Sequence, residues 1–115
     1  MPYLVMQTNI AISDALSAAL LSQLSSIMVN VTGKPERYVM VAVQENKLML
    51  FGGNTQPLAY LECKSISLTA SQAKAISVEV AELLKISLNI CQDRIYIEFS
   101  NCAPEFWGWN GSTFG

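Results

Sequence analysis

Pro2 has the most unusual chemistry in this sequence, because removal of Met1 would leave it with a free secondary amine. Proline is also tolerated as the first residue of a strand, so the dipeptide alone does not establish a catalytic role. The chain contains no histidine, which excludes Ser-His-Asp and Cys-His mechanisms and most zinc sites. Any acid–base catalyst is therefore a lysine, tyrosine, aspartate, glutamate or cysteine side chain, or the amino terminus.

The cysteines and the diglycine give no sign of a metal or phosphate site. Cys63, Cys91 and Cys102 are widely spaced and odd in number, with no Cys-x-x-Cys, so we expect reduced and mostly buried thiols. Gly52-Gly53 is not followed by Lys-Ser/Thr, which predicts a turn rather than a phosphate-binding loop. We therefore expect neither a metal nor a cofactor.

Length and composition predict one domain spanning residues 1–115. The chain is 51% hydrophobic and only 14% charged, which suggests that part of its surface is buried against other subunits. The net charge of −2, with scattered basic residues, gives no stripe for nucleic acid. No uninterrupted apolar run reaches the roughly 18 residues of a membrane span, and no positive charge precedes the first apolar segment. We expect a cytoplasmic protein with no nucleic-acid or membrane partner.

The hydrophobic periodicity changes from strand to helix twice along the chain. The first predicted helix follows Ser13 as its N-cap and ends at Gly33. The second is expected at 71–88, after a capping box of Thr69 and Gln72. The predicted strands are residues 3–8, 38–44, 47–51, 58–66 and 95–99.

The two halves of the chain repeat each other at a constant offset. Tyr3-Leu4 and Tyr60-Leu61 begin corresponding strands, and the dipeptides Glu36-Arg37 and Asp93-Arg94 precede corresponding later strands. Each half is therefore expected to form a βαβ unit. Right-handed crossovers would place both helices on one face of the shared sheet.

The segment 38–43, YVMVAV, is apolar on both faces of its predicted strand. Such strands are typically buried on both faces, whereas the helices would cover only one. We therefore expect another chain to cover the second face, which predicts an obligate oligomer of undetermined size.

Six motifs occur in order along the whole chain: MP at 1–2, TGKPERYV at 32–39, FGGNTQP at 51–57, KSI at 64–66, DRIYI at 93–97 and GWNGSTF at 108–114. Together they resemble the macrophage migration inhibitory factor family of the tautomerase superfamily, and the last motif is the most specific. The resemblance implies an α+β fold of two β-α-β repeats, forming a four-stranded mixed sheet with two helices on one face. It also implies a homotrimer in which the sheets form a barrel.

The resemblance implies a cofactor-independent keto–enol tautomerase acting on small α-keto acids, such as phenylpyruvate, or on dopachrome-like compounds. The family's catalytic group is an amino-terminal proline, here Pro2, exposed by removal of Met1. Burial in an apolar pocket beside Lys34 would lower the pKa of this amine from its ordinary value of about 8. Such a base is neutral near pH 7 and suited to proton transfer.

Further positions match residues that bind the family's substrates. Lys34 matches a lysine that binds the carboxylate, and Ile66, with Ser65 before it, matches an isoleucine whose backbone N–H contacts the substrate. Tyr96 matches a tyrosine contributed by a neighbouring subunit. The substrate's ring would lie among Tyr3, Tyr38, Trp109 and Phe114. By themselves, Lys34 is also typical of a helix C-terminus and the aromatic residues of ordinary packing.

The sequence departs from the family pattern in three respects. Glu98 replaces an asparagine of the mammalian proteins and, alternating with Tyr96, is expected to point into the pocket and weaken the binding of an anionic substrate. Trp107 replaces a smaller aliphatic residue at the pocket mouth and would narrow it. Leu58 and Leu61 replace a Cys-x-x-Cys, so we expect no thiol-oxidoreductase activity.

A second hypothesis is a cytokine-like interaction protein with a vestigial pocket and a receptor-binding trimer surface. The family's cytokines are secreted without a leader, so leaderless secretion stays open here. A ferredoxin-like metal or RNA module is disfavoured, because the sequence lacks both a Cys-x-x-Cys and the aromatic and basic strand motifs of RNA-binding sheets.

Overall fold

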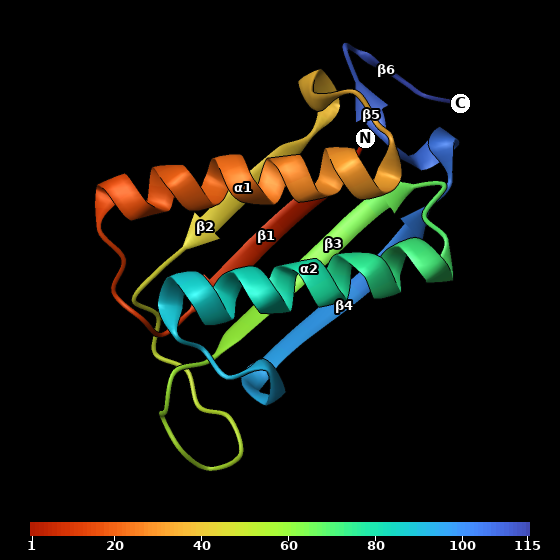
Figure 1. The fold of residues 1–115 in the computed structure, drawn as a ribbon. Helices are drawn as coiled ribbons and strands as arrows, with labels where there is room; N and C mark the ends of the chain where they lie inside the picture. Colours follow the sequence, from red (N-terminus) through yellow and green to blue (C-terminus); the bar gives the residue numbers. More distant parts are fainter.

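The computed structural model describes residues 1–115 and shows two helices packed on one face of a four-stranded sheet (Figure 1). The main elements are β1 (Tyr3–Thr8), α1 (Asp14–Thr32), β2 (Met40–Gln44), β3 (Ala59–Ile66), α2 (Ala70–Leu88) and β4 (Ile95–Cys102). The smaller elements are the 3-10 turns η1 (Glu36–Tyr38), η2 (Gln92–Arg94) and η3 (Pro104–Phe106), and the short strands β5 (Gly108–Trp109) and β6 (Ser112–Thr113).

The order of strands in the sheet is β2-β1-β3-β4. β1 is parallel to β2 and β3 is parallel to β4, whereas β1 and β3 pair antiparallel in the centre. Each half of the chain is thus one β-α-β unit, and both helices lie on the same side (Figure 1). This arrangement confirms the α+β fold expected from the repeat and from the resemblance.

The predicted helix ends are confirmed in atomic detail. The Ser13 hydroxyl accepts a hydrogen bond from the Leu16 N–H at 3.2 Å, and Gly33 ends α1 in the left-handed region, with φ 71°. At the start of α2, the Thr69 hydroxyl accepts from the Gln72 N–H at 3.2 Å, and the Gln72 side chain accepts from the Thr69 N–H at 3.0 Å.

The core lies between the helices and the sheet. Alternate residues of β1, namely Leu4, Met6 and Thr8, face the helices and are fully buried. Leu4 and Met6 pack in one cluster with Leu20, Leu24 and Met28 of α1 and Ile76, Val80 and Leu84 of α2, together with residues of β3.

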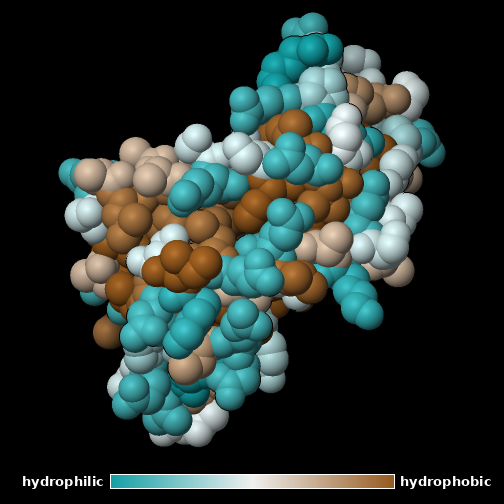
Figure 2. Space-filling model, viewed as in Figure 1, coloured by the Kyte–Doolittle hydropathy of each residue, from teal (hydrophilic) through white to brown (hydrophobic).

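By length and composition alone, α1 is apolar enough to cross a membrane, with a mean hydropathy of 1.4. Its residues Leu20, Leu24 and Met28 are fully buried in the core, which explains one apolar face of this helix. The solvent side of the helix layer is mixed, with hydrophobic residues between hydrophilic ones (Figure 2). Val78 and Ile86 are among the exposed hydrophobic residues of α2.

Three predicted strand boundaries differ in the structure. Tyr38 belongs to η1 and not to a strand, because the Val39 N–H closes a tight turn onto the Glu36 carbonyl at 2.9 Å, so β2 begins only at Met40. β4 continues beyond residue 99 to Cys102, because β3 pairs with it as far as Ile66. β3 begins one residue later, and α2 one residue earlier, than expected.

The predicted strand at 47–51 does not form within this chain. Phe51 makes a single bridge to Asn54, and the preceding residues have no strand partner. Leu48 is fully exposed and Leu50 is 67% exposed. An apolar segment without a neighbouring strand cannot complete its backbone hydrogen bonds or bury its side chains.

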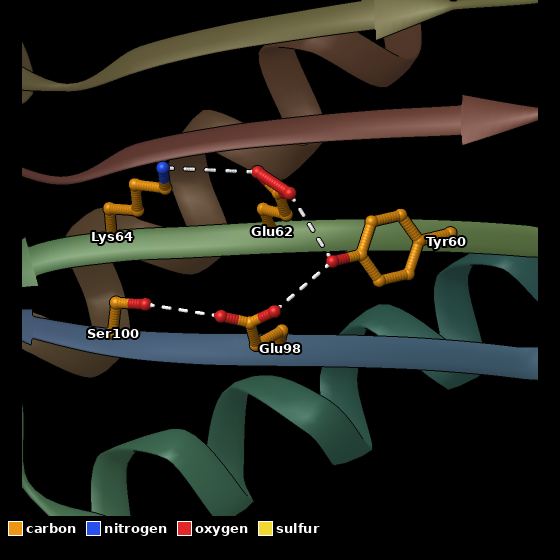
Figure 3. A network of polar contacts seen from close by, with 5 residues as sticks. All are labelled: Tyr60, Glu62, Lys64, Glu98 and Ser100. Carbon is orange, nitrogen blue, oxygen red and sulfur yellow. Dashed lines mark hydrogen bonds and ion pairs between the residues drawn. The ribbon is translucent and has the colours of Figure 1, made fainter.

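The sheet face opposite the helices is largely polar (Figure 3). The Tyr60 hydroxyl lies 3.2 Å from a carboxylate oxygen of Glu62 and 3.3 Å from one of Glu98, which oppose each other on β3 and β4. Lys64 lies 3.9 Å from Glu62, and Ser100 donates to Glu98 at 3.4 Å. Desolvation, followed by the two negative charges, raises the pKa of Tyr60.

The apolar pattern of residues 38–43 on both faces therefore does not extend across the second face of the sheet. On β2, Val41 and Val43 pack against the helix-side core, so only Met40 and Ala42 give the open face an apolar strip beside Tyr3 and Val5. The sequence pattern of residues 38–43 did not show that the neighbouring strands carry charges on that side. A chain covering this face would meet a hydrated surface rather than a dry core.

The cysteines are free, as expected, but they are not mostly buried. Cys63 lies in the core, and burial raises the pKa of its thiol to about 11, so it is un-ionised at neutral pH. Cys102 is partly buried and Cys91 is exposed.

Arg94 organises the loop between β2 and β3. Its guanidinium donates to four backbone carbonyl groups, at 3.1 Å to Pro57, Phe51 and Gln56 and at 3.2 Å to Asn54. It also lies over the Phe51 ring, 5.1 Å from the centroid. Arg94 thus holds together a loop that lies outside the four-stranded sheet, and the carbonyl groups of Phe51 and Asn54 also accept from each other's N–H.

We predict that Arg94→Lys lowers the free energy of unfolding by about 1 kcal/mol, because an ammonium group cannot bond four carbonyls in the fixed fork geometry of a guanidinium. Urea denaturation followed by tryptophan fluorescence would measure the change. Arg37→Lys is the matched control, since Arg37 occupies the corresponding position of the first repeat and makes no hydrogen bond. Equal destabilisation by the two substitutions would contradict the assignment.

Candidate functional site

A cavity of about 400 Å³ opens where the N-terminus meets the C-terminal hairpin. Its walls come from the start of β1, from the η1–β2 segment and from residues 107–114, with one residue of β3. Figure 1 shows the N-terminus beside β5, at the same end of the sheet. The lining residues are Met1, Pro2, Tyr3, Arg37, Tyr38, Val39, Met40, Lys64, Trp107, Gly108, Trp109 and Phe114.

The C-terminal hairpin brings the tail's aromatic residues to this cavity. Asn110 and Gly111 have φ values of 52° and 75°, as a two-residue type I′ turn requires. The turn pairs β5 with β6, and the Phe114 N–H donates to the Trp107 carbonyl at 3.2 Å. The predicted strands did not include this hairpin, although the Asn-Gly pair within the motif at 108–114 is a sequence signal for it.

Three aromatic rings form one wall of the cavity. Tyr38 lies edge-on to Trp109, with ring centroids 5.4 Å apart, and edge-on to Phe114, at 6.0 Å. Trp109 and Phe114 stack with an interplanar angle of 13° at 5.5 Å. This interlocked cluster, which we call the aromatic wall, presents a preformed surface for a flat apolar group.

The main chain holds Pro2 in place. Its ring is buried, and its carbonyl accepts a hydrogen bond from the Met40 N–H at 3.0 Å, which continues the pairing of β1 with β2. Burial, and secondly the positive charge of Lys34, lower the pKa of the amino group on Met1. An amine at this position is neutral more often at pH 7 than an ordinary amino terminus, and can accept a proton.

Six of the eleven predicted site residues line the cavity: Pro2, Tyr3, Tyr38, Trp107, Trp109 and Phe114. Lys34 lies outside this lining, but its charge acts on the amine. Ser65 and Ile66 are buried at the end of β3, where the Ser65 hydroxyl donates to the Ile66 carbonyl at 3.1 Å. Since Tyr3 pairs with Lys64, the antiparallel register places Ser65 beside Pro2.

Tyr96 and Glu98 do not reach the cavity of their own chain. They lie on β4 opposite Tyr60 and Glu62, whereas the cavity lies near Lys64. Four residues separate Tyr60 from Lys64, which is about 13 Å along a strand. Tyr96, 64% exposed, instead packs against Phe51 with ring centroids 4.6 Å apart. Within this chain, neither side chain belongs to the lining of the cavity.

Two basic residues of the lining were not predicted. Arg37 precedes the aromatic Tyr38, and its guanidinium lies over that ring, 4.8 Å from the centroid. Lys64 stands on β3 directly opposite Tyr3. Arg37 lies within the motif at 32–39 and Lys64 within the motif at 64–66, but neither motif assigned a role to these two residues.

The comparisons with known proteins cover the whole chain. The sequence model described as macrophage migration inhibitory factor matches residues 1–115. The macrophage migration inhibitory factor of Xenopus tropicalis is 35% identical over 115 residues, 99% of each chain. A macrophage migration inhibitory factor homolog of Brugia malayi is 36% identical over 116 residues, 100% of each chain.

Solved structures agree with the sequence matches. The crystal structure of a macrophage migration inhibitory factor homologue from Prochlorococcus marinus is similar with a TM-score of 0.93 at 40% identity, covering 98% of this chain and 99% of that one. Sequence, fold and the cavity at the N-terminus lead to one assignment. The chain belongs to the macrophage migration inhibitory factor family, within the tautomerase superfamily.

Proposed function

We propose that this protein is a cofactor-independent keto–enol tautomerase of small aromatic α-keto acids such as phenylpyruvate. One observation carries the proposal: the amino terminus lies in the lining of an aromatic-walled cavity, where burial and Lys34 lower its pKa. The substrate's ring would lie against the aromatic wall and its carboxylate near Lys34. Removal of Met1 would expose the Pro2 nitrogen as the terminal amine, and the hydrogen bond from the Met40 N–H to the Pro2 carbonyl already fixes the position of Pro2.

The proposed reaction moves one proton between carbon and oxygen, with the Pro2 amine as carrier. The neutral amine removes a proton from the carbon beside the carbonyl and the electron pair forms the C=C bond. The resulting ammonium gives its proton to the oxygen, directly or through water, which regenerates the amine. The reverse direction returns the proton to carbon and re-forms the ketone. Lys34 and the Ile66 N–H would hold the carboxylate, and the Tyr96 hydroxyl of a neighbouring subunit would polarise the oxygen.

We further propose a homotrimer, because Tyr96 and Glu98 can contribute only to another chain's cavity. Leu48 and Leu50 are exposed on a segment that has no strand partner within this chain. A hollow of about 490 Å³ lies along this segment and contains none of the predicted catalytic residues. We assign this edge to contact between subunits, where a neighbouring chain would complete its hydrogen bonds. No specific observation favours receptor binding over the enzyme.

We predict that wild-type protein starting at Pro2 accelerates the decay of phenylpyruvate enol, whereas Pro2→Gly loses about 10²-fold or more of that rate. Protein retaining Met1 should also be inactive, because its Pro2 nitrogen is a tertiary amide without basicity. Absorbance of the enol gives the rate, and mass spectrometry verifies the N-terminus. Equal rates for all three proteins would refute the proposal.

We predict that Lys34→Gln raises the pKa of the terminal amine, because removing a nearby positive charge favours the ammonium form. The rise of activity with increasing pH should then shift to higher pH, since the neutral amine is the base. NMR titration of protein carrying ¹⁵N-proline would measure this pKa directly. Lys85→Gln, at the end of α2, is the control. An unchanged pKa in Lys34→Gln would contradict the role of this charge.

We predict that Glu98→Asn lowers KM for phenylpyruvate about tenfold, the effect of about 1.4 kcal/mol, because it removes a negative charge from a neighbouring subunit's cavity. An uncharged analogue should show little change. Steady-state kinetics on both substrates would test this, with Glu79→Gln on α2 as the control for net charge. If neither KM changes, the role of Glu98 is confined to its contacts with Tyr60 and Ser100.

A further inference from the structure

The cavity carries an excess of positive charge in a protein whose net charge is −2. Arg37 and Lys64 line it, Lys34 acts on its amine, and no carboxylate belongs to the lining. Lys64 is balanced by Glu62 at 3.9 Å on the open sheet face. Lys34 and Arg37 form no ion pair within the chain. Arg37, in the lining, is therefore free to bind a ligand of this cavity, and Lys34, outside the lining, adds a second unpaired charge near its amine.

The internal repeat shows that Arg37 is unusual. Arg94, its counterpart in the second half, donates hydrogen bonds from its guanidinium to four backbone carbonyl groups. Arg37 has no hydrogen-bond acceptor, and its one recorded contact is with the face of Tyr38. The adjacent Glu36 instead accepts a hydrogen bond from Ser25 of α1 at 3.0 Å. The guanidinium of Arg37 is held in place by stacking while its donors stay free.

The two unpaired cations serve different parts of the cavity. Lys34 influences the terminal amine, where the reacting atoms of an α-keto acid would lie. Arg37 stacks on Tyr38, which belongs to the aromatic wall. A substrate ring placed against this wall would therefore have Arg37 near its edge and Lys34 near its α-keto end.

Building on the proposed function, we propose that the preferred substrates are dianionic: aromatic α-keto acids with a second acidic group on the ring, bound by Arg37. A planar guanidinium with free donors can bind a carboxylate or phosphate through two parallel hydrogen bonds. Lys34 would still bind the α-carboxylate. A Glu98 carboxylate contributed by a neighbouring subunit would offset only one of the two charges, leaving the cavity positive.

Binding of unreactive analogues tests this inference without any need for turnover. Isothermal titration calorimetry on protein starting at Pro2 would compare phenylacetate, 4-carboxyphenylacetate and 4-phosphonooxyphenylacetate. At least one of the two ring-acid compounds should bind about tenfold more tightly than phenylacetate, and the tighter one identifies the second acidic group. Equal affinity for all three compounds would overturn the proposal.

Substitutions at Arg37 show whether this residue causes the preference. Arg37→Gln should abolish the tenfold difference between the ring-acid compounds and phenylacetate, and Arg37→Lys should retain part of it. Lys74→Gln removes the same charge from the exposed side of α2 and should keep the full preference. If Arg37→Gln weakens all three compounds equally, the residue has only a structural role and the proposal fails.

The two proposals can fail separately. If Pro2→Gly retains full activity while the ring-acid compounds still bind more tightly through Arg37, the catalytic proposal fails and the dianion preference stands. If phenylpyruvate enol is converted by Pro2 but the three analogues bind alike, only the dianion preference fails.

Discussion

The antiparallel pairing of β1 with β3 is the contact on which the rest of this structure depends. It joins two parallel β-α-β units into one sheet, and its register sets Tyr3 against Lys64. That register carries the chain start to the end of the sheet where the C-terminal hairpin lies. A slip of one residue would exchange Leu4 and Met6 for Tyr3 and Val5 on the helix side, losing the core and the cavity together.

The repeat gives each half the same backbone and different tasks. In the first half, the residues before β2 form the cavity wall, and Arg37 stacks on Tyr38 with its donors free. In the second half, the residues before β4 hold the loop between β2 and β3 in place, because the Arg94 guanidinium donates hydrogen bonds to backbone carbonyl groups of that loop. The two equivalent positions of the repeat thus have different roles: Arg37 is available for binding, whereas Arg94 stabilises the structure.

Sequence reasoning succeeded where the determining interactions are local. The helix caps at Ser13 and Thr69 depend on residues three positions apart, and the core faces of both helices follow from spacing alone. It failed where a partner distant in sequence decides. Residues 47–51 were predicted as a strand but have no strand partner in this chain. The apolar pattern of residues 38–43 gave no indication of the charges that β3 and β4 carry on the second face of the sheet. Tyr96 and Glu98 could be assigned to a site only through the family resemblance, because one chain does not bring them to it.

The hydrogen bond between the Pro2 carbonyl and the Met40 N–H fixes the start of β1 whether or not Met1 has been removed. Because this bond lies on the C-terminal side of Pro2, cleavage of the Met1–Pro2 bond leaves it intact. Processed and unprocessed chains should then have nearly the same shape and melting behaviour, and mixed assemblies of the two should form freely. Scattering and calorimetry would report one homogeneous species, while the number of free Pro2 amines per assembly would range from none to one for every chain.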